Sequence, residues 1–350
     1  METVQPRDVE RFTETLASYH RILVLTHSNP DPDALASAAG LRLLIRKKRK
    51  TPTVIGYSGF LTRAENREMM TLLRLHARPI EHMDLRRFRA IVLVDTQPGA
   101  GNNVLSARQK PAAVIDHHAL RRAAAECPFH LVEKTCGATS TLVYEMLAAA
   151  GVEIPSNIAT ALFYGIRTDT LDLGREATER DRAAYKELFS HADYGKLALI
   201  MHPRLPRAYY RVVDKALESA IVYGDCIHAP VGEVTTPEYI SAIADYVLPL
   251  EGTRWALATG TYEGNLYFSL RTLTARKDAA KILRRAIGTH GSAGGHHKMA
   301  GGLAVLRDLD AAEREALTSK VLAALFSALG ANTAAPMLLL AANEKPSPQQ

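Results

Sequence analysis

The chain has 350 residues, a formal net charge of +6 and a sequence pI of about 9.1. This length allows two domains, each with its own core, and the mildly basic balance suits polyanionic ligands without requiring them. Three widely spaced cysteines without a CxxC pair argue against a disulfide framework or a zinc ribbon and favour a reduced, cytoplasmic protein. The charged N-terminus lacks the apolar stretch of a secretory signal, and no apolar run approaches the ~18 residues of a membrane span.

The first half of the chain alternates short apolar runs with helical spacing. Buried parallel strands are predicted over residues 22–26, 53–57, 90–94 and 112–115. Helical spacing of apolar residues covers 34–46 and 140–150, and a further apolar element, 158–166, ends at a GIRTDT turn. Polar loops follow these strands, and loops at the carboxyl ends of parallel strands are where α/β proteins build their sites.

The second half of the chain predicts a separate domain. After a charged helical stretch, strands are expected over 221–223, 255–262 and 266–273, with a hairpin turn in which Gly264 and Asn265 supply positive φ. A helix over 277–287 precedes a glycine-rich loop. We therefore predict an α/β protein with an N-terminal domain whose mainly parallel sheet is flanked by helices, and a smaller C-terminal α/β domain. The expected boundaries are 1–190 for the first domain, 191–220 for a helical linker, 221–330 for the second domain and 331–350 for a flexible tail.

Acidic and imidazole side chains follow several of the predicted elements. They lie in the loop HSNPDPD at 27–33, at Asp95, in the run Asp116-His117-His118 and at Asp169. Two prolines stiffen the first loop. Taken alone, Asp33 is explained as well by N-capping of the following helix, and each other acid by a cap or a turn.

Taken together, these side chains indicate a metal site. Clustered carboxylates are tolerable only when they are solvated, protonated or bound to a cation. A mixed Asp/His set without thiolates favours Mn²⁺ or Mg²⁺, and the imidazoles favour Mn²⁺. Two ions roughly 3.5–4 Å apart are the usual device for displacement at phosphorus, so we expect two Mn²⁺ ions, with Mg²⁺ as the alternative.

A fifth segment, GGHHKMAGG at 294–302, combines glycines with two histidines and a lysine. Glycines let backbone N–H groups approach a phosphate closely. A flexible loop with solvent-exposed histidines explains the same residues equally well.

In chain order, these five segments resemble the motifs of the DHH/DHHA1 phosphoesterase family, over roughly residues 15–310. HSNPDPDA, VDT, the literal Asp-His-His at 116–118 and GIRTDT resemble the four motifs of the DHH domain, and AGGHHKMAG resembles the glycine/histidine motif of the DHHA1 domain. The resemblance implies six metal ligands, of which Asp95 and Asp169 are shared by both ions: His27, Asp31, Asp33, Asp95, His117 and Asp169.

The resemblance also implies roles for residues around the metals. Asp116 would orient His117, as metal-bound imidazoles commonly require, and His118 would contact the scissile phosphate. In the C-terminal domain, which would face the first domain across the cleft, the expected substrate contacts are Arg271, Gly294, Gly295 and His296. The chain departs from the usual family pattern at Pro32, at TQPGAGNN after Asp95, and at LDLGRE after GIRTDT, where many members have an aromatic residue. These departures leave the base preference open.

By resemblance, we expect a stand-alone Mn²⁺-dependent phosphodiesterase or phosphatase similar to the oligoribonuclease/pAp phosphatases. Its partners would be short RNA or DNA oligonucleotides, linear dinucleotides or 3′-phosphoadenosine 5′-phosphate (pAp), and a homodimer would be in keeping with the family. A cyclic di-AMP or other cyclic dinucleotide phosphodiesterase is the alternative. A catalytically inactive nucleotide sensor is disfavoured because the ligand positions are filled, and a polyphosphatase or pyrophosphatase would be expected to have a different C-terminal domain.

Overall fold

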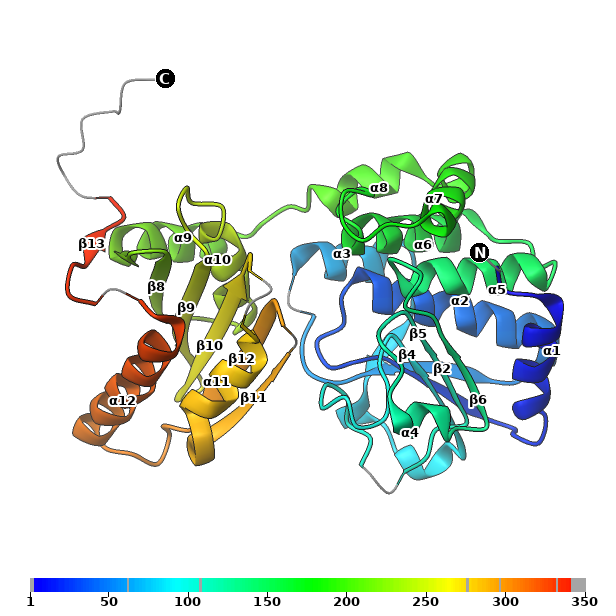
Figure 1. Ribbon diagram of the computed structural model, residues 1–350, viewed down its shortest axis with the longest axis horizontal. Coiled ribbons are helices and arrows are strands. Elements are labelled where there is room, and N and C mark those ends of the chain that lie inside the picture. Colours follow the sequence, from blue (N-terminus) through cyan, green and yellow to red (C-terminus); the bar gives the residue numbers. More distant parts are fainter. Residues whose placement is uncertain are drawn as a thin grey trace. The chain divides into compact units, whose positions relative to one another are not determined.

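The computed structural model describes residues 3–61, 63–106, 109–274, 277–295, 297–331 and 333–340. The chain folds as two compact units, Met1–Arg204 and Leu205–Gln350, shown in Figure 1. The segment predicted as a linker, 191–220, is divided between them. Helix α8 (Tyr194–Met201) buries Leu197 and Ile200 in the core of the first unit, whereas α9 (Arg207–Ser219) buries Val212 and Ala216 in the second.

The described part of the first unit is built on a six-stranded parallel sheet with the order β3-β2-β1-β4-β5-β6. Its strands are β1 (Ile22–Leu25), β2 (Thr53–Tyr57), β3 (Ala77–Pro79), β4 (Ala90–Val94), β5 (Ala113–Asp116) and β6 (Phe129–Val132). Besides α8, its helices are α1 (Pro6–Thr15), α2 (Pro32–Arg49), α3 (Ala64–Leu72), α4 (Arg122–Ala125), α5 (Thr139–Ala149), α6 (Ser156–Asp169) and α7 (Glu179–His191), with 3₁₀ turns at Ile80–His82 and Leu85–Arg87. The predicted fold class and four predicted strands are confirmed.

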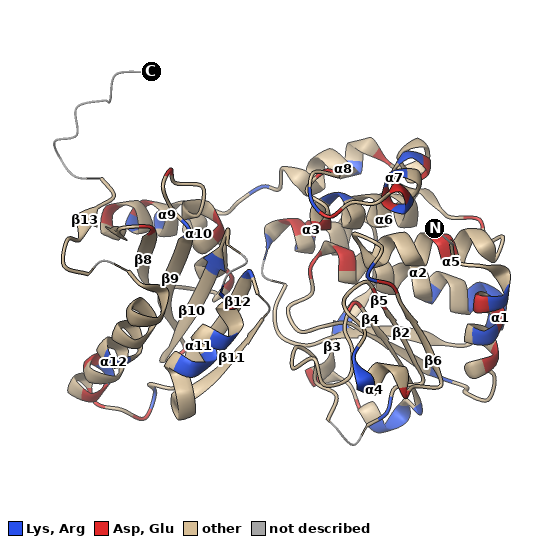
Figure 2. Cartoon of the chain, viewed as in Figure 1, with Lys and Arg blue, Asp and Glu red and all other residues tan. Residues whose placement is uncertain are grey.

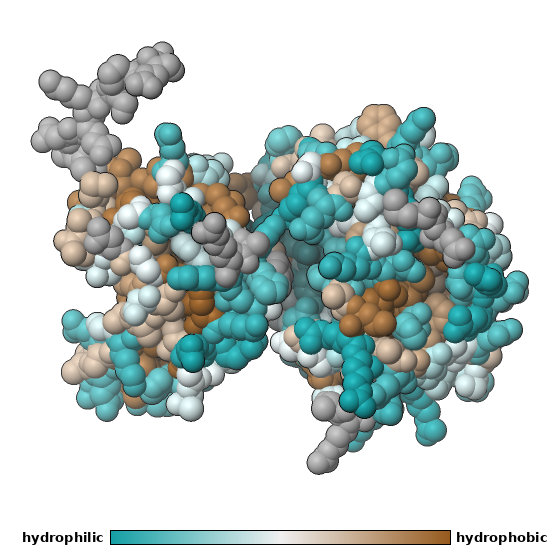
Figure 3. Space-filling view, viewed as in Figure 1, coloured by the Kyte–Doolittle hydropathy of each residue, from teal (hydrophilic) through white to brown (hydrophobic). Residues whose placement is uncertain are grey.

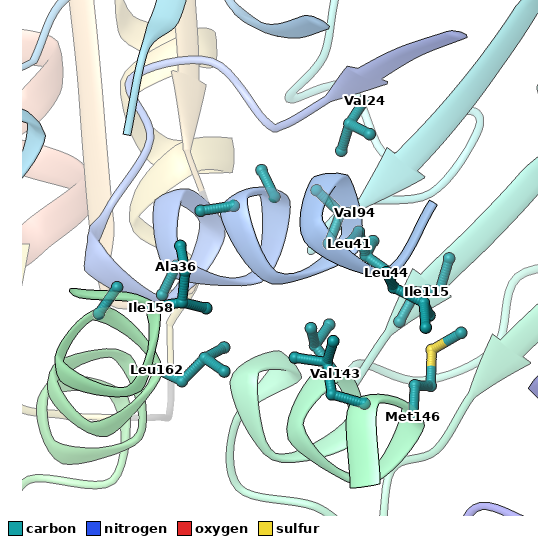
Figure 4. Packing of buried hydrophobic residues seen from close by; sticks show 14 of the residues in the cluster. Val24, Ala36, Leu41, Leu44, Val94, Ile115, Val143, Met146, Ile158 and Leu162 are labelled. Atoms are coloured by element: carbon teal, nitrogen blue, oxygen red, sulfur yellow. The ribbon is translucent and has the colours of Figure 1, made fainter. Parts of the chain in front are cut away.

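Helix α2 lies in the middle of the first core, between the sheet and helices α5 and α6. In Figure 4, Leu41 and Leu44 of α2 lie near Ile115, while Val143 of α5 and Leu162 of α6 approach from the other side. A Cβ at Gly40 would come within 2.5 Å of Val143 Cγ1, so glycine permits the close contact of α2 with α5. This packing fixes the N-terminal end of α2, which carries two of the predicted metal ligands.

The second unit contains a mixed sheet that is covered by helices on both faces. Among the described residues it has seven strands in the order β11-β12-β10-β9-β8-β7-β13, and β8 and β9 pair in parallel. Helices α9 and α10 pack against Ala256 and Ala258, whereas α11 and α12 pack against Leu257, because side chains alternate along β9. The strands are β7 (Ile221–Tyr223), β8 (Cys226–Glu233), β9 (Trp255–Tyr262), β10 (Asn265–Thr272), β11 (Gly291–Gly295), β12 (Met299–Ala304) and β13 (Met337–Leu338); the remaining helices are α10 (Glu238–Val247), α11 (Ala279–Ile287), the 3₁₀ turn Gly288–His290 and α12 (Ala311–Leu329).

Three local predictions for the second unit are wrong. The glycine-rich loop is instead a hairpin of β11 and β12, which the sequence hides because glycines show no alternation of polar and apolar side chains. In the turn before β10 the positive φ values belong to Glu263 (47°) and Gly264 (74°), while Asn265 is already in the strand. The predicted tail contains β13, which pairs with β7, and its residues 341–350 lie outside the described part of the chain.

The visible surface of each unit is mainly hydrophilic with smaller apolar areas, as Figure 3 shows. Within the described residues, no helix combines the length and the apolar character that crossing a bilayer requires.

Candidate metal centre

The predicted ligands of the first unit lie on loops and helix ends beside the carboxyl ends of β1, β4 and β5. Asp31 is the N-cap residue of α2, and its carboxylate accepts a hydrogen bond from the Ala34 amide at 3.0 Å. Asp95 directly follows β4, and His117 follows β5. Asp169 was predicted in a turn, but it is the last residue of α6, because the apolar element before it is a helix that continues through the motif.

The six predicted ligand side chains form two groups of three. His27, Asp31 and Asp95 make one group, and Asp33, His117 and Asp169 make the other. Within each group, one ligand atom from each residue lies within 4.8 Å of the others. The groups adjoin, since His117 Nε2 is 3.7 Å from Asp95 Oδ1 and 3.2 Å from Asp169 Oδ2. Side chains separated by up to 142 positions in the sequence are therefore brought together as predicted.

Both imidazoles in these groups are held by backbone carbonyls. His27 Nδ1 lies 2.9 Å from the carbonyl oxygen of Ser28, and His117 Nδ1 lies 3.3 Å from that of Cys136. A carbonyl can only accept, so each Nδ1 carries a proton, and Nε2 is the ring nitrogen that can bind a metal once its own proton is lost. The two Nε2 atoms face carboxylates, with His27 Nε2 at 3.4 Å from Asp95 Oδ2. This tautomer is the one in which Nε2 can bind a metal.

Asp33 is fixed by a helix other than its own. Its two carboxylate oxygens accept hydrogen bonds from the amides of Thr139 and Ser140, each at 2.8 Å, at the start of α5. The N-cap of α2 is Asp31, so the alternative explanation of Asp33 as that cap is wrong. Each oxygen of Asp33 keeps a second lone pair, so these hydrogen bonds orient the carboxylate and still allow it to bind a metal ion.

Asp95 is held by both its backbone and its side chain. It has a left-handed backbone (φ 58°), a conformation that Asp tolerates better than most residues. Its Oδ1 accepts a hydrogen bond from the Thr139 hydroxyl at 2.8 Å, and the residue is 3% exposed. The position turns the chain sharply at the end of β4 and directs the carboxylate toward the histidines.

Asp116 contacts a different histidine from the one predicted. Its Oδ1 lies 2.8 Å from His118 Nδ1, whereas the Nδ1 of His117 is held by Cys136, so the expectation that Asp116 orients His117 is wrong. The other oxygen, Oδ2, accepts a hydrogen bond from Gln97 at 2.6 Å. The reason is geometric, since side chains two positions apart on an extended strand point to the same side. His118, 59% exposed at its side chain, is thereby held at the rim of the acidic cluster.

Without a bound cation, the cluster has more acidic groups than nearby positive charges to balance them. Burial raises the pKa of Asp33 well above its usual range, and Asp95 and Asp169 raise it further. Burial likewise raises the pKa of Asp169 to about 8, with Asp31 and Asp95 adding to the effect. Burial lowers the pKa of His27, but Asp31 and Asp95 outweigh it and raise that pKa well above the ordinary value. The carboxylates therefore attract positive charge beyond what the chain itself supplies.

These residues fit divalent cations of the Mn²⁺ or Mg²⁺ type. Each group offers one imidazole nitrogen and carboxylate oxygens from two aspartates. Oxygen donors with a single imidazole and no thiolate suit Mn²⁺, while the nearby Cys136 is buried and its pKa is raised by burial, which keeps it a neutral thiol.

The predicted substrate contacts of the second unit lie in and beside its sheet. Arg271 at the end of β10 is 8% exposed, and its Nε donates a hydrogen bond to Asp245 at 2.7 Å. Gly294 and Gly295 are in β11, and Gly294 pairs with Gly301 of β12. A Cβ at Gly294 would have no atom within 4 Å, so neither crowding nor a positive φ demands glycine there. His296 lies outside the described residues.

Several residues of the centre were not found from the sequence. They are Thr139, which holds Asp33 and Asp95, and Gln97, which holds Asp116. The Thr-Ser pair before the apolar residues of α5 was a recognisable helix start, but only the fold reveals which acids it meets. Gln97 belongs to the TQPGAGNN segment that departs from the usual motif, so that departure supplies a partner for Asp116.

Comparison with known proteins decides the family. The DHH family N-terminal domain matches residues 21–166, a segment that contains five of the six predicted ligands. The chain therefore contains a DHH family N-terminal domain. Asp169 lies three residues beyond the matched segment, on the same helix, α6.

Two relatives of this DHH-family chain match longer segments. The uncharacterized protein MJ1633 of Methanocaldococcus jannaschii is 32% identical over 286 residues, which are 80% of this chain and 56% of that protein. A probable manganese-dependent inorganic pyrophosphatase of Streptococcus pyogenes serotype M5 is 27% identical over 186 residues, 51% of this chain and 60% of the relative. The matches thus span less than two thirds of either relative.

Solved structures share the fold of this DHH-family chain at low identity. An exopolyphosphatase-related protein from Bacteroides fragilis has a TM-score of 0.65 and 16% identity, covering 94% of this chain and 99% of that one. RecJ of Thermus thermophilus in complex with Mn²⁺ has a TM-score of 0.52 and 17% identity, covering 92% of this chain and 54% of RecJ.

Proposed function

We propose that this DHH-family chain is a Mn²⁺-dependent phosphoesterase that hydrolyses short oligoribonucleotides, linear dinucleotides or pAp. The observation that carries the proposal is the division of the six side chains into two adjoining groups of one histidine and two aspartates. Two such groups match the requirement of a two-ion site for in-line displacement at phosphorus. The family membership, the manganese-dependent relative and the Mn²⁺ complex of RecJ support manganese as the cofactor.

In this proposal each group of three holds one ion, with Asp95 and Asp169 reaching both. Bound ions would stabilise the negative charge that develops on the phosphoryl oxygens and lower the pKa of a bound water. The chain's own contribution is orientation. Ser28 and Cys136 hold the imidazoles in the binding tautomer, and the start of α5 fixes Asp33 and Asp95.

His118 is proposed to donate a hydrogen bond to a phosphoryl oxygen of the substrate. Its Nδ1 is bound to Asp116, and its side chain remains more than half exposed, so Nε2 is available to a ligand. Burial lowers the pKa of His118, but Asp116 and Asp95 outweigh it and raise that pKa to about 9. A protonated imidazole would stabilise negative charge that develops on the phosphoryl oxygens.

The second unit is proposed to bind the part of the substrate away from the cleaved bond. Gly294 and Gly301 are paired across the β11–β12 hairpin and form a patch without side chains, where a ligand could approach the face of the sheet closely. Figure 2 shows Lys and Arg positions in blue along α11, which packs against this hairpin and would attract a polyanion. Arg271 and the predicted His296 belong to the same proposal.

A second candidate function is hydrolysis of inorganic pyrophosphate or polyphosphate. It is favoured by the match to a probable inorganic pyrophosphatase over about half of this chain. The glycine patch of the second unit favours the nucleotide substrate instead, because a flat backbone surface can accept a planar base or a terminal phosphate.

A substrate panel separates the candidates. The Mn²⁺-loaded chain is incubated with pAp, pApA, cyclic di-AMP, RNA oligomers of two to ten nucleotides, pyrophosphate and polyphosphate, and kcat/KM is measured for each. The proposal expects the highest values for pAp, pApA or the shortest oligomers. Highest turnover of pyrophosphate or polyphosphate would establish the second candidate, and binding without turnover of any substrate would indicate a nucleotide sensor.

A further inference from the structure

A strained turn follows Asp169 in the first unit. Three consecutive residues without glycine, Leu171, Asp172 and Leu173, have left-handed backbones with φ values of 49°, 54° and 66°. Residues with a side chain rarely adopt this conformation, so a run of three persists only where surrounding contacts enforce it. Backbone hydrogen bonds close this turn, including Asp172 N to Arg167 O at 2.8 Å and Arg175 N to Thr170 O at 2.8 Å.

The turn brings Arg175 back onto the end of α6. Arg175 Nη2 donates a hydrogen bond to the backbone carbonyl of Asp169 at 2.6 Å and lies 3.5 Å from its Oδ1. The carbonyl takes the short contact, so the Asp169 carboxylate is left for another partner. Arg175 Nε and Nη1 have no hydrogen-bond partner within the described residues, and the side chain is 34% exposed. One nitrogen, Nη2, therefore holds the guanidinium beside the cluster, and the N–H groups of Nε and Nη1 remain available to donate to a ligand.

We propose that Arg175 binds the phosphoryl group of the substrate beside the metal centre. The inference rests on the proposed phosphoesterase function and adds a residue to it. A guanidinium beside two divalent cations is repelled by them, so its placement weakens metal binding unless an anion joins the site. A phosphoryl group supplies that anion, and the fork of N–H donors matches its oxygens.

Two roles of Arg175 predict opposite effects on metal affinity. If Arg175 only held Asp169 in place, its removal would loosen a ligand and weaken Mn²⁺ binding. If it binds phosphate, its removal relieves repulsion, so Mn²⁺ binds as tightly as before or more tightly, while phosphate binds more weakly. Metal affinity measured without phosphate, and phosphate affinity measured with saturating Mn²⁺, therefore distinguish the roles.

The test uses the full chain and Arg175→Gln, with Arg175→Lys as the conservative variant. Arg182→Gln on α7 is the matched control, because Arg182 is an exposed arginine paired with Glu179. Calorimetry gives the Kd of Mn²⁺ alone and the Kd of inorganic phosphate for the Mn²⁺-loaded protein. We expect Arg175→Gln to raise the phosphate Kd at least fivefold, with Lys intermediate, the control unchanged and Mn²⁺ binding not weakened.

A phosphate Kd that rises less than fivefold in Arg175→Gln, or a Mn²⁺ Kd that rises fivefold or more, would overturn the inference. Failure of the proposed function gives a different result. In that case the wild-type chain with Mn²⁺ neither binds phosphate nor hydrolyses bis-p-nitrophenyl phosphate, whatever the variants do.

Discussion

Asp95 joins the two halves of the centre, because its carboxylate lies near His27 on one side and His117 on the other. Its left-handed backbone restricts the position to residues that tolerate positive φ, among which Asn is the closest in shape. Asn also keeps an oxygen for the Thr139 hydroxyl. Asp95→Asn therefore removes the charge while leaving the fold of the turn in place.

We expect Asp95→Asn to reduce turnover of bis-p-nitrophenyl phosphate by more than about a hundredfold, since a shared metal ligand is worth several kcal/mol. The number of Mn²⁺ ions bound per chain should fall below two. Asp84→Asn is the control, because Asp84 is a surface acid that pairs with Arg86. Unchanged turnover and two bound ions in Asp95→Asn would remove Asp95 from the metal centre.

His228 gives the second unit a pH-dependent stability that is independent of any metal. It is buried in β8, its Nε2 lies 2.9 Å from the Thr259 hydroxyl, and burial lowers its pKa to about 4. The unfolded chain takes up the proton near pH 6.5, so the contribution of His228 is present above pH 6.5 and is lost as pH falls toward 4. The loss should be on the order of 3 kcal/mol.

Denaturant unfolding followed between pH 7 and 4 checks this effect. His228→Gln should flatten the fall in stability over that range, whereas His20→Gln, at an exposed histidine, should not. Equal pH dependence in the wild type and in His228→Gln would show that His228 titrates normally in the folded protein.

At the scale of elements, the start of α7 holds the loop on which the metal centre depends. Asp181 is fully buried, and its carboxylate accepts hydrogen bonds from the Gly137 amide at 2.8 Å and the Thr141 hydroxyl at 2.6 Å. The Cys136 carbonyl that contacts His117 belongs to the residue just before Gly137, and Thr139, which contacts Asp33 and Asp95, lies between Gly137 and Thr141. Asp181 is thus a positioning residue that acts through this loop.

Asp181→Asn replaces an acceptor oxygen with a donor and should cost about 3 kcal/mol of stability. We also expect it to weaken Mn²⁺ binding by about tenfold, in the range of residues that orient metal ligands. Asp193→Asn is the matched control, since Asp193 caps α8 through the Lys196 amide. A loss of stability with unchanged Mn²⁺ affinity in Asp181→Asn would limit its role to folding.

The elements differ in how readily the sequence reveals them. β1 and β4 are fully buried, so their continuous apolar runs are visible in the sequence. β11 was missed because its five residues, GSAGG, have the composition of a loop and become a strand through pairing with β12. The acids of the centre were found from the sequence as a set, but their individual hydrogen-bond partners were not. The partners of Asp33 are amides at the start of α5, and only tertiary packing brings them together.

At the scale of the whole molecule, we propose that the second unit selects the substrate and that the first unit carries the chemistry. Arg271 tests this division, although its Nε is paired with Asp245. Arg271→Lys keeps a charge beside Asp245 but loses the fork geometry. We expect it to raise KM for pApA at least fivefold and to leave kcat for bis-p-nitrophenyl phosphate within twofold, because the small substrate does not need the second unit. Equal losses for both substrates would indicate a structural role of the Arg271–Asp245 pair.

The resemblance of five short segments was sufficient to predict the family, and the four segments of the first unit contribute side chains to one cluster. The substrate could not be predicted in the same way. The residues that would select it, such as Gly294 and Arg271, would act through the shape of the second unit, and a fold alone does not specify a substrate.

The most direct measurement is a crystal structure of the chain grown with Mn²⁺, with anomalous scattering recorded at the manganese edge. The account predicts two manganese peaks, one bound by His27, Asp31 and Asp95 and the other by Asp33, His117 and Asp169. A crystal in which these six side chains bind no manganese, or in which manganese binds elsewhere on the chain, would contradict it.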